Sequence, residues 1–254
     1  MNNLSFSYFD AGRREEALKI REEVLSLSRK VNGPEHHYTL WAMTNLATSL
    51  LDTGRSEEAL KLREEVLPLR RKVSGPEHPD TLTAMANLAV SWIHAGRADD
   101  AIKLWEDVLK LRIKVLGPEH PETLLTMINF ASACDATGRR DEAQKLYEEV
   151  LPLCKKVRGP EHPDTLLAMA NLAISYSRPG SGRQDDALKL REEVLAGRRK
   201  AGGDEHPDTL MAMTRLADSY DGAVVWTKRS RFRKRHSPSS VAYCGQTTLS
   251  LRQR

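Results

Sequence analysis

The chain of 254 residues is 40% hydrophobic and 29% charged, with a formal net charge of +4. Every Asp and Glu lies at or before Asp221, while eight Lys and Arg residues follow it, so residues 1–221 carry a net charge of −4. No apolar run approaches the ~18 residues that a membrane span needs. The three cysteines are odd in number and form no CxxC pair, which argues against a disulfide framework and favours a reducing, cytoplasmic location.

An eight-residue phrase, GPEHPDTL, organises most of the chain. It stands at 75–82 and 159–166, and near copies stand at 33–40, 117–124 and 203–210. The step between copies is 42 residues three times and then 44, and a fixed period of this size is typical of a solenoid of stacked units. The predicted segments are a partial first repeat at 1–32, full repeats at 33–74, 75–116, 117–158 and 159–202, a terminal capping helix at 203–221, and a basic tail at 222–254.

Each copy of the phrase has the features of a corner between two helices. Gly75 can adopt a positive φ that closes a helix, and Pro76 cannot continue one. Pro79 and Asp80 suit the first turn of the next helix. A second glycine corner lies between copies, as at Gly54. Each period therefore holds two helices, which we name helix A, following the phrase, and helix B.

The histidine of the phrase recurs once per period, at His36, His78, His120, His162 and His206. Stacked helices lie ~8 to 10 Å apart, whereas metal ligands must lie within ~2 Å of a shared ion. One ion therefore cannot join the row. We expect the histidines to make hydrogen bonds that stabilise the corners.

Apolar spacing predicts which helix faces form the core. Helix A carries apolar residues at steps of three, four and seven, and helix B at steps of three and four. The helix A stripe is Leu40, Met43, Leu46, Ala47 and Leu50 in the first full repeat and Leu210, Met213, Leu216, Ala217 and Tyr220 in the last copy. The helix B stripe is Ala59, Leu62, Val66, Leu69 and Val73, with Lys61, Arg63, Glu64, Glu65, Arg70 and Arg71 on a solvated opposite side. The helix B spacing alone would suit a coiled coil, but a corner every 42 residues keeps each run below the three or four heptads required.

The two ends of the chain depart from the period. Residues 1–13 align with 43–55, so the chain begins partway through a helix A, and we expect a truncated helix at about 2–11. After Asp221 the period is lost, and a basic run, KRSRFRKRH, occupies 228–236. Such a run can act in nuclear import or contact nucleic acid. The alternatives that we favour are a disordered tail or an unrelated terminus that is not a selected part of the protein, because the period and the acidic residues end together.

The placed helices resemble the tetratricopeptide repeat, in which small residues stand where the two helices cross closely. Alanines fall at those positions in each period: Ala47 with Ala59, Ala89 with Ala101, Ala131 with Ala143, and Ala173 with Ala187. The 42-residue form, with NLA on helix A and a GxEHPxT corner, is similar to the repeats of kinesin light chains and of arrays appended to nucleotide-binding sensor proteins. The resemblance, over about 2–220, implies an all-α, right-handed superhelical solenoid of antiparallel helix pairs. It does not extend to the heptad segment through which kinesin light chains bind the heavy chain.

The same resemblance implies a binding surface on helix A, which lines the concave face of such arrays. A groove-facing position near the middle of helix A falls on Asn45, Asn87, Asn129 and Asn171, and on Arg215 in the last copy. A carboxamide both donates and accepts, so a row of them can pair with the amides of an extended peptide. The alternative is that each asparagine bonds a neighbouring repeat and fixes the stacking. Trp41, one turn earlier, is the candidate aromatic anchor.

These features predict a non-catalytic scaffold for a partner protein or extended peptide, with no cofactor, metal, membrane or small-molecule substrate. The sequence contains no GxxxxGK[ST], HExxH or complete GxGxxG motif. The groove positions also lack the lysines and arginines with which chaperone-binding members of the family clamp a terminal carboxylate. Two alternatives stay open: a sensor array from a larger nucleotide-binding protein, and nucleic-acid binding or nuclear import through 228–236.

Overall fold

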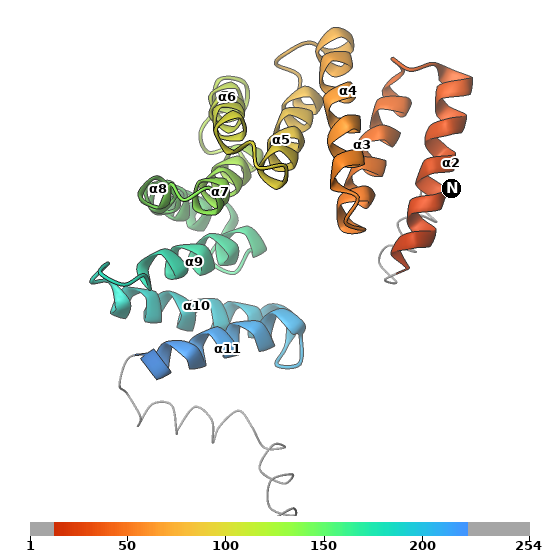
Figure 1. Cartoon of the computed structure of the whole chain (residues 1–254). Coiled ribbons are helices and arrows are strands. Elements are labelled where there is room, and N and C mark those ends of the chain that lie inside the picture. The colour runs from red at the N-terminus through yellow and green to blue at the C-terminus, as the bar shows by residue number, and fades with distance from the viewer. Residues whose placement is uncertain (1–12, 223–254) are drawn as a thin grey trace, which may run out of the picture. The chain divides into compact units, whose positions relative to one another are not determined.

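A computed structural model describes residues 13–222, and every regular element in that range is a helix. Helices A and B alternate along it (Figure 1). Helix A is represented by α3 (His37–Asp52), α5 (Pro79–His94), α7 (Pro121–Ala136), α9 (Pro163–Tyr176) and α11 (Pro207–Gly222). Helix B is represented by α2 (Arg14–Asn32), α4 (Ser56–Ser74), α6 (Ala98–Leu116), α8 (Arg140–Arg158) and α10 (Gln184–Gly202).

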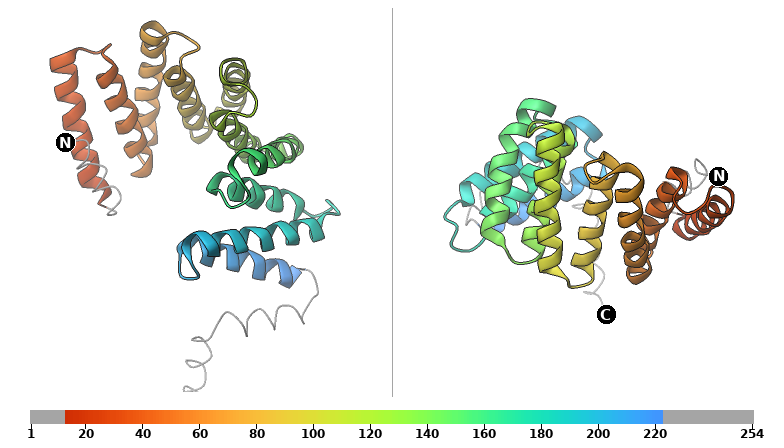
Figure 2. Two further views of the ribbon diagram at one scale, coloured as in Figure 1. Left: turned by 180° about the vertical axis from the view of Figure 1, so that it is seen from behind. Right: turned by 90° about the horizontal axis from the view of Figure 1, so that it is seen from above.

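The chain divides into two compact units between Val157 and Arg158. In the first unit each helix from α3 to α6 packs against the helix before it and the helix after it, and the further views agree on this side-by-side order (Figure 2). In the second unit α10 packs between α9 and α11. The predicted all-α solenoid of helix pairs is confirmed.

The corner before each helix A is built around glycine and histidine, as the prediction of corner hydrogen bonds requires. Gly75 has φ 94° and ψ 161°, a conformation essentially confined to glycine. Three residues later His78 is the N-cap of α5, and its Nδ1 accepts a hydrogen bond from the backbone N–H of Asp80 at 3.2 Å. The same contact recurs at His36, His120, His162 and His206. These histidines therefore satisfy one of the N–H groups that a helix start leaves without an intrahelical partner.

The helix A core is confirmed in the full repeats. Leu40, Met43 and Ala47 are 0% exposed in α3, and the equivalent residues of α5, α7 and α9 are buried as well. In α11 the prediction is confirmed for Leu216 and Tyr220, which are buried, but it is wrong for Leu210, which is 51% exposed. The physical reason is that α10 covers one side of α11, while no described helix follows on the other.

The helix B stripe needs a larger correction. Val73, expected in the core, is 45% exposed, whereas Arg63 and Arg70, expected on the solvated side, are only 6% and 5% exposed. Both side chains are buried, and their guanidinium groups donate hydrogen bonds to Asn87 and Asp80 of the following repeat. Because a hydropathy pattern counts arginine as polar, it excluded Arg63 and Arg70 from the predicted buried face of helix B.

Two predicted segments lie outside the described residues. They are the truncated helix at about 2–11 and the basic run at 228–236. Within residues 13–222, none of the helices is both long enough and apolar enough to cross a membrane.

Candidate partner-binding surface

One face of each helix A is left accessible by the core. In α3, Trp41 and Asn45 are half-buried and Thr48 is exposed, and in α5 Thr83 is exposed while Asn87 is half-buried. Steps of four and three place such residues on one side of a helix. Asn129 of α7 and Arg215 of α11 are exposed, and Asn171 of α9 is half-buried. Each predicted position therefore lies at the protein surface, within its own unit.

The asparagine side chains of the first unit keep their hydrogen-bonding capacity. Among the described residues, the amide groups of Asn45, Asn87 and Asn129 have no hydrogen-bond partner. Asn171, in the second unit, takes part in an interaction, so the observation does not extend to it. For these three residues, the alternative that the amide fixes the stacking of repeats has no contact to support it.

Stacking is instead assisted by buried arginines at the eighth position of helix B. Nη1 of Arg63 donates to the backbone carbonyl of Asn87 at 2.6 Å and to Oγ of Ser91 at 2.9 Å. Arg21 makes the same pair of bonds to Asn45 and Ser49, at 3.0 and 2.5 Å. Burial lowers the pKa of Arg63 to about 10, partly offset by the charge of Asp52, so its charge persists at neutral pH.

Sequence reasoning missed this pairing, although the sequence contains a signal for it. Position eight of helix B and position thirteen of the following helix A change together within the first unit. Arginine and serine occupy them twice, and Trp105 of α6 and Ala133 of α7 occupy them once. Trp105 is 2% exposed and Ala133 4% exposed, so an apolar pair replaces a polar one. In the second unit Arg191 of α10 again bonds Ser219 of α11.

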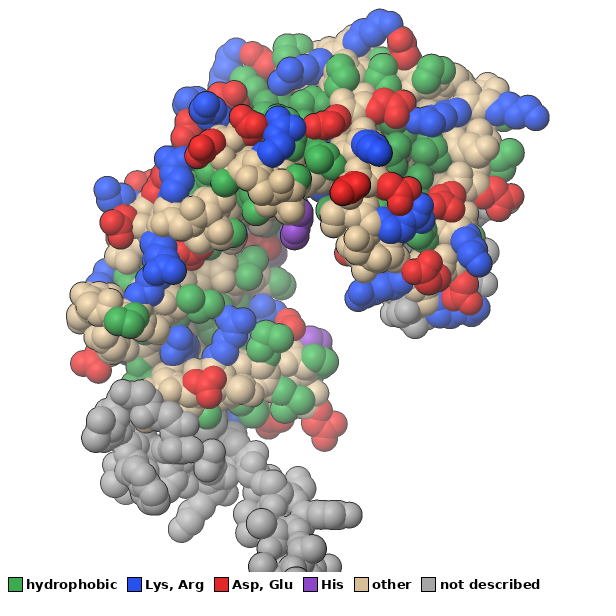
Figure 3. Space-filling view, viewed as in Figure 1, with side chains coloured by type: hydrophobic (Ala, Val, Ile, Leu, Met, Phe, Trp, Pro, Cys, Tyr) green, Lys and Arg blue, Asp and Glu red, His purple; other side chains and the backbone are tan. Residues whose placement is uncertain are grey.

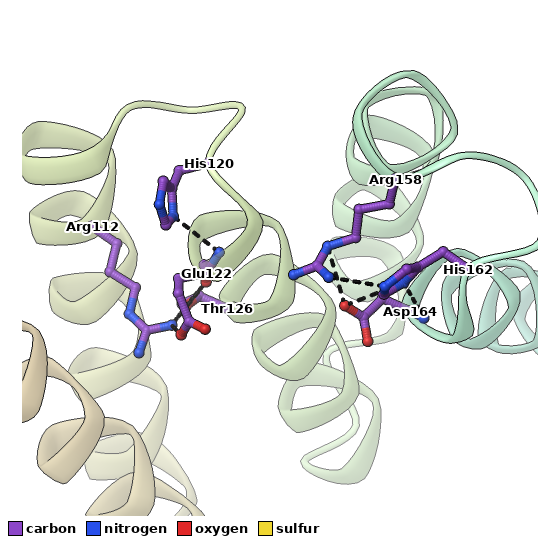
Figure 4. A network of polar contacts seen from close by, with 7 residues as sticks. All are labelled: Arg112, His120, Glu122, Thr126, Arg158, His162 and Asp164. Carbon is purple, nitrogen blue, oxygen red and sulfur yellow. Dashed lines mark hydrogen bonds and ion pairs between the residues drawn. The ribbon is translucent and has the colours of Figure 1, made fainter.

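A second row of arginines, at the fifteenth position of helix B, is paired with carboxylates at the start of the next helix A. Nη1 of Arg112 lies 3.0 Å from Oε2 of Glu122 and 2.7 Å from Oγ1 of Thr126 (Figure 4). Arg70 pairs with Asp80 at 2.8 Å in the same manner. Burial lowers the pKa of Arg112, and the charge of Glu122 opposes that change. The arginines of these pairs are buried and the carboxylates are half exposed, so the row presents little net charge.

The contact differs at the end of α8. Cys154, in the first unit, replaces the arginine at position fifteen, and Arg158, in the second unit, supplies the charge. Its Nη1 lies 3.0 Å from Nε2 of His162, and its Nε lies 3.4 Å from Oδ2 of Asp164 (Figure 4).

A small pocket lies beside the predicted aromatic anchor. Its volume is about 200 Å³, and it is lined by Trp41, His37 and Tyr38 of α3 together with the Arg70–Asp80 pair. Because the two charges neutralise each other and three rings supply the remaining wall, the pocket suits one apolar or aromatic side chain. Over the face shown in Figure 3, acidic and basic side chains are interspersed.

No metal site is evident in the described range, where no three His, Cys, Asp or Glu residues converge on one point. The recurring histidines are instead engaged as helix caps, with Nδ1 directed at a backbone N–H.

Models of the tetratricopeptide repeat match residues 1–72, 43–91, 93–156, 136–181 and 165–208, which is most of the sequence. The chain belongs to the tetratricopeptide repeat family. Solved structures specify the type. Crystal structures of nearly identical TPR-like repeats from a Podosopora anserina protein described as a kinesin light chain are 31% and 30% identical to it, with TM-scores of 0.66 and 0.65. They cover 78% and 79% of this chain and 93% and 94% of the other, so this tetratricopeptide repeat protein is of the kinesin light chain-like type.

Two more distant structures share the fold alone. BtubC (BKLC) from P. vanneervenii is 20% identical, with a TM-score of 0.73, and the match covers 95% of this chain and 96% of that one. A signal transduction ATPase with a tetratricopeptide repeat sensor from Pyrococcus horikoshii is 16% identical, with a TM-score of 0.65, over 95% of this chain and 36% of that protein. No curated protein matches this tetratricopeptide repeat chain.

Proposed function

We propose that this tetratricopeptide repeat protein is a non-catalytic scaffold that binds an extended segment of a partner protein on the faces of its A helices. The observation that supports the proposal most directly is the row of asparagine amides in the first unit, which are accessible and have no hydrogen-bond partner among the described residues. A partner that supplies backbone N–H and C=O groups would satisfy both functions of each amide. The side chains of the partner would then matter only where a pocket receives them.

Trp41 provides such a place. Its pocket is neutral and mainly aromatic, so an apolar side chain of the bound segment is expected to enter it. Arg215, exposed on α11, is proposed to take the corresponding position in the last copy. The proposal includes a reducing, cytoplasmic location, which is supported by Cys134 and Cys154 forming no disulfide.

A random peptide library displayed on phage tests the proposal with the full chain as bait. Peptides enriched on the wild-type protein should lose at least tenfold in affinity for the Asn87→Ala, Asn129→Ala double variant. Its stability should change by less than ~0.5 kcal/mol, because no side-chain hydrogen bond among the described residues is lost. Asn32→Ala is the matched control, since Asn32 lies at the exposed end of α2. Trp41→Ala should weaken only peptides with an apolar residue at a fixed position. Equal affinity for wild-type and double variant would refute the proposal.

A second candidate function is that of a sensor array within a larger nucleotide-binding protein. The fold shared with the Pyrococcus horikoshii ATPase is the observation that favours it, because the matched part there is described as a sensor. Mapping the transcript decides between the two: a continuous reading frame that joins these repeats to a nucleotide-binding domain would support the sensor array.

A further inference from the structure

Among residues 13–222, no helix covers one face of α11, the last described helix A, although the same face is closed in every full repeat. Three positions on this face are buried in the full repeats, where they are occupied by leucine, methionine and alanine. The leucine position faces helix B of the same repeat, as Leu166 does against Gly197 of α10. The leucines Leu40, Leu82, Leu124 and Leu166 are 0%, 0%, 1% and 1% exposed, whereas Leu210 is 51% exposed. Met213 and Ala217 are half-buried, while the equivalent methionines are at most 7% exposed and the equivalent alanines 0%. We name Leu210, Met213 and Ala217 the α11 seam.

A charged group beside the seam lacks the contact that its equivalents make. In each full repeat the glutamate of the corner pairs with a lysine near the end of helix B: Glu35 with Lys72, Glu77 with Lys114, Glu119 with Lys156 and Glu161 with Lys200, at 2.5 to 2.7 Å. Glu205 stands at the same position before α11. It is exposed and has no ion pair or hydrogen bond in the described range. Among the described residues, the α11 seam is therefore uncovered and Glu205 is unpaired, although the equivalent apolar and charged groups both contact helix B in the full repeats.

We propose that the α11 seam is a docking site for an amphipathic helix of a partner protein that has the pattern of a helix B. Its apolar stripe would repeat the spacing of Ala59, Val66 and Leu67, which are at most 7% exposed against α3 and α5. A basic residue near its C-terminal end would pair with Glu205. The site continues an interface that the protein already forms between α3 and α4, α5 and α6, and α9 and α10.

Charge and spacing distinguish this occupant from two others. A second copy would place α11 against α11, and an antiparallel pair would bring Glu205 toward Asp218, so two acidic groups would meet. The residues of this chain after Gly222 contain no Asp or Glu, whereas every described helix B has two acidic residues in its first turn. A partner helix that has the apolar spacing of helix B and a basic residue near its C-terminal end would both cover the α11 seam and pair with Glu205.

The probe is a fluorescein-labelled peptide of residues 56–74, the helix B whose partner α3 has the same leucine, methionine and alanine as the α11 seam. Its anisotropy is titrated with the full 254-residue chain. We expect saturable one-to-one binding that Leu210→Asp weakens at least tenfold. Leu27→Asp is the matched control, because Leu27 is a leucine 45% exposed on α2, and it should leave the affinity unchanged. The Asn87→Ala, Asn129→Ala variant should also bind normally, so this test is independent of the proposed function.

A charge exchange tests the orientation. Glu205→Lys should weaken the wild-type peptide about three- to tenfold, and a peptide with Lys72→Glu should recover that loss on the Glu205→Lys protein, which general adhesion to apolar surface would not produce. Binding that is insensitive to Leu210→Asp would overturn the proposal. So would a dimer in light scattering that Leu210→Asp converts to monomer, which assigns the seam to a second copy. Peptide binding that appears only in the Trp226→Asp protein would show that residues 223–254 occupy the α11 seam in the wild-type chain. That result would also overturn the proposal.

Discussion

The contact of Arg63 with the following repeat allows a quantitative test of how the helices are held in register. Replacing Arg63 with alanine removes two hydrogen bonds from an ionised donor, at 2.6 and 2.9 Å, each contributing ~1.5 to 3 kcal/mol. Burial of the guanidinium group, which lowers its pKa to about 10, opposes that gain. We therefore expect a net loss of ~2 to 3 kcal/mol in the free energy of unfolding, near the upper range for single substitutions.

The measurement is urea unfolding followed by circular dichroism, with hydrogen exchange of α5 amides to locate the change. Arg71→Ala on the same helix is the control, because that side chain is exposed, and it should change stability by less than ~0.5 kcal/mol. Arg63→Trp combined with Ser91→Ala introduces the two residues that occupy the equivalent positions one repeat later, Trp105 and Ala133. The double variant should therefore be more stable than the sum of the two single changes predicts. Additive effects, or a loss below ~0.5 kcal/mol for Arg63→Ala, would refute the reasoning.

Three further predictions concern the corners, the core and the surface. His78→Ala should lower the free energy of unfolding by ~1 kcal/mol, because it removes a helix cap, and His78→Asn should restore most of it in thermal melts. Burial raises the pKa of the Cys134 thiol to about 12, so mass spectrometry should show no alkylation of native Cys134 by iodoacetamide at pH 8 and full alkylation in denaturant. Because the unfolded thiol loses its proton first, the stability contributed by Cys134 is complete below pH 9 and is lost as pH rises toward 12. Lys114→Ala should change stability by less than ~0.5 kcal/mol, since Lys114 and Glu77 are both largely exposed.

The features that repeat with the period could be predicted from the sequence. The glycine and histidine of each corner determine where a helix ends and the next begins, and these requirements are local: a positive φ at Gly75 and a cap at His78 involve only residues three apart. The helix A core followed from apolar spacing for the same reason, since residues such as Leu40 and Leu46 have no polar side-chain groups and are buried by packing alone. Such positions are buried wherever a neighbouring helix exists on both sides.

The contacts that cross from one repeat to the next could not be predicted in this way. Arg63 bonds atoms 24 and 28 residues away, and nothing in its own helix distinguishes it from the exposed Arg71. Leu210 has the same sequence context as Leu166, yet it is exposed because its environment depends on a helix that does not follow it within the described residues. In both cases burial is set by a neighbouring repeat and not by the spacing within one helix.

Asn87 connects stacking with the proposed binding surface. Its backbone carbonyl accepts a hydrogen bond from Arg63, while its side-chain amide has no hydrogen-bond partner in the described range. The main chain of Asn87 is therefore fixed by the stacking contact, and its side chain stays accessible to a partner. The arginine therefore positions the amide row without occupying it. It follows that Arg63→Ala should lower both stability and peptide affinity, because it releases α5 from α4, whereas Asn87→Ala should lower affinity alone. Peptide binding that persists undiminished in folded Arg63→Ala protein would show that the register of the repeats does not matter to the site.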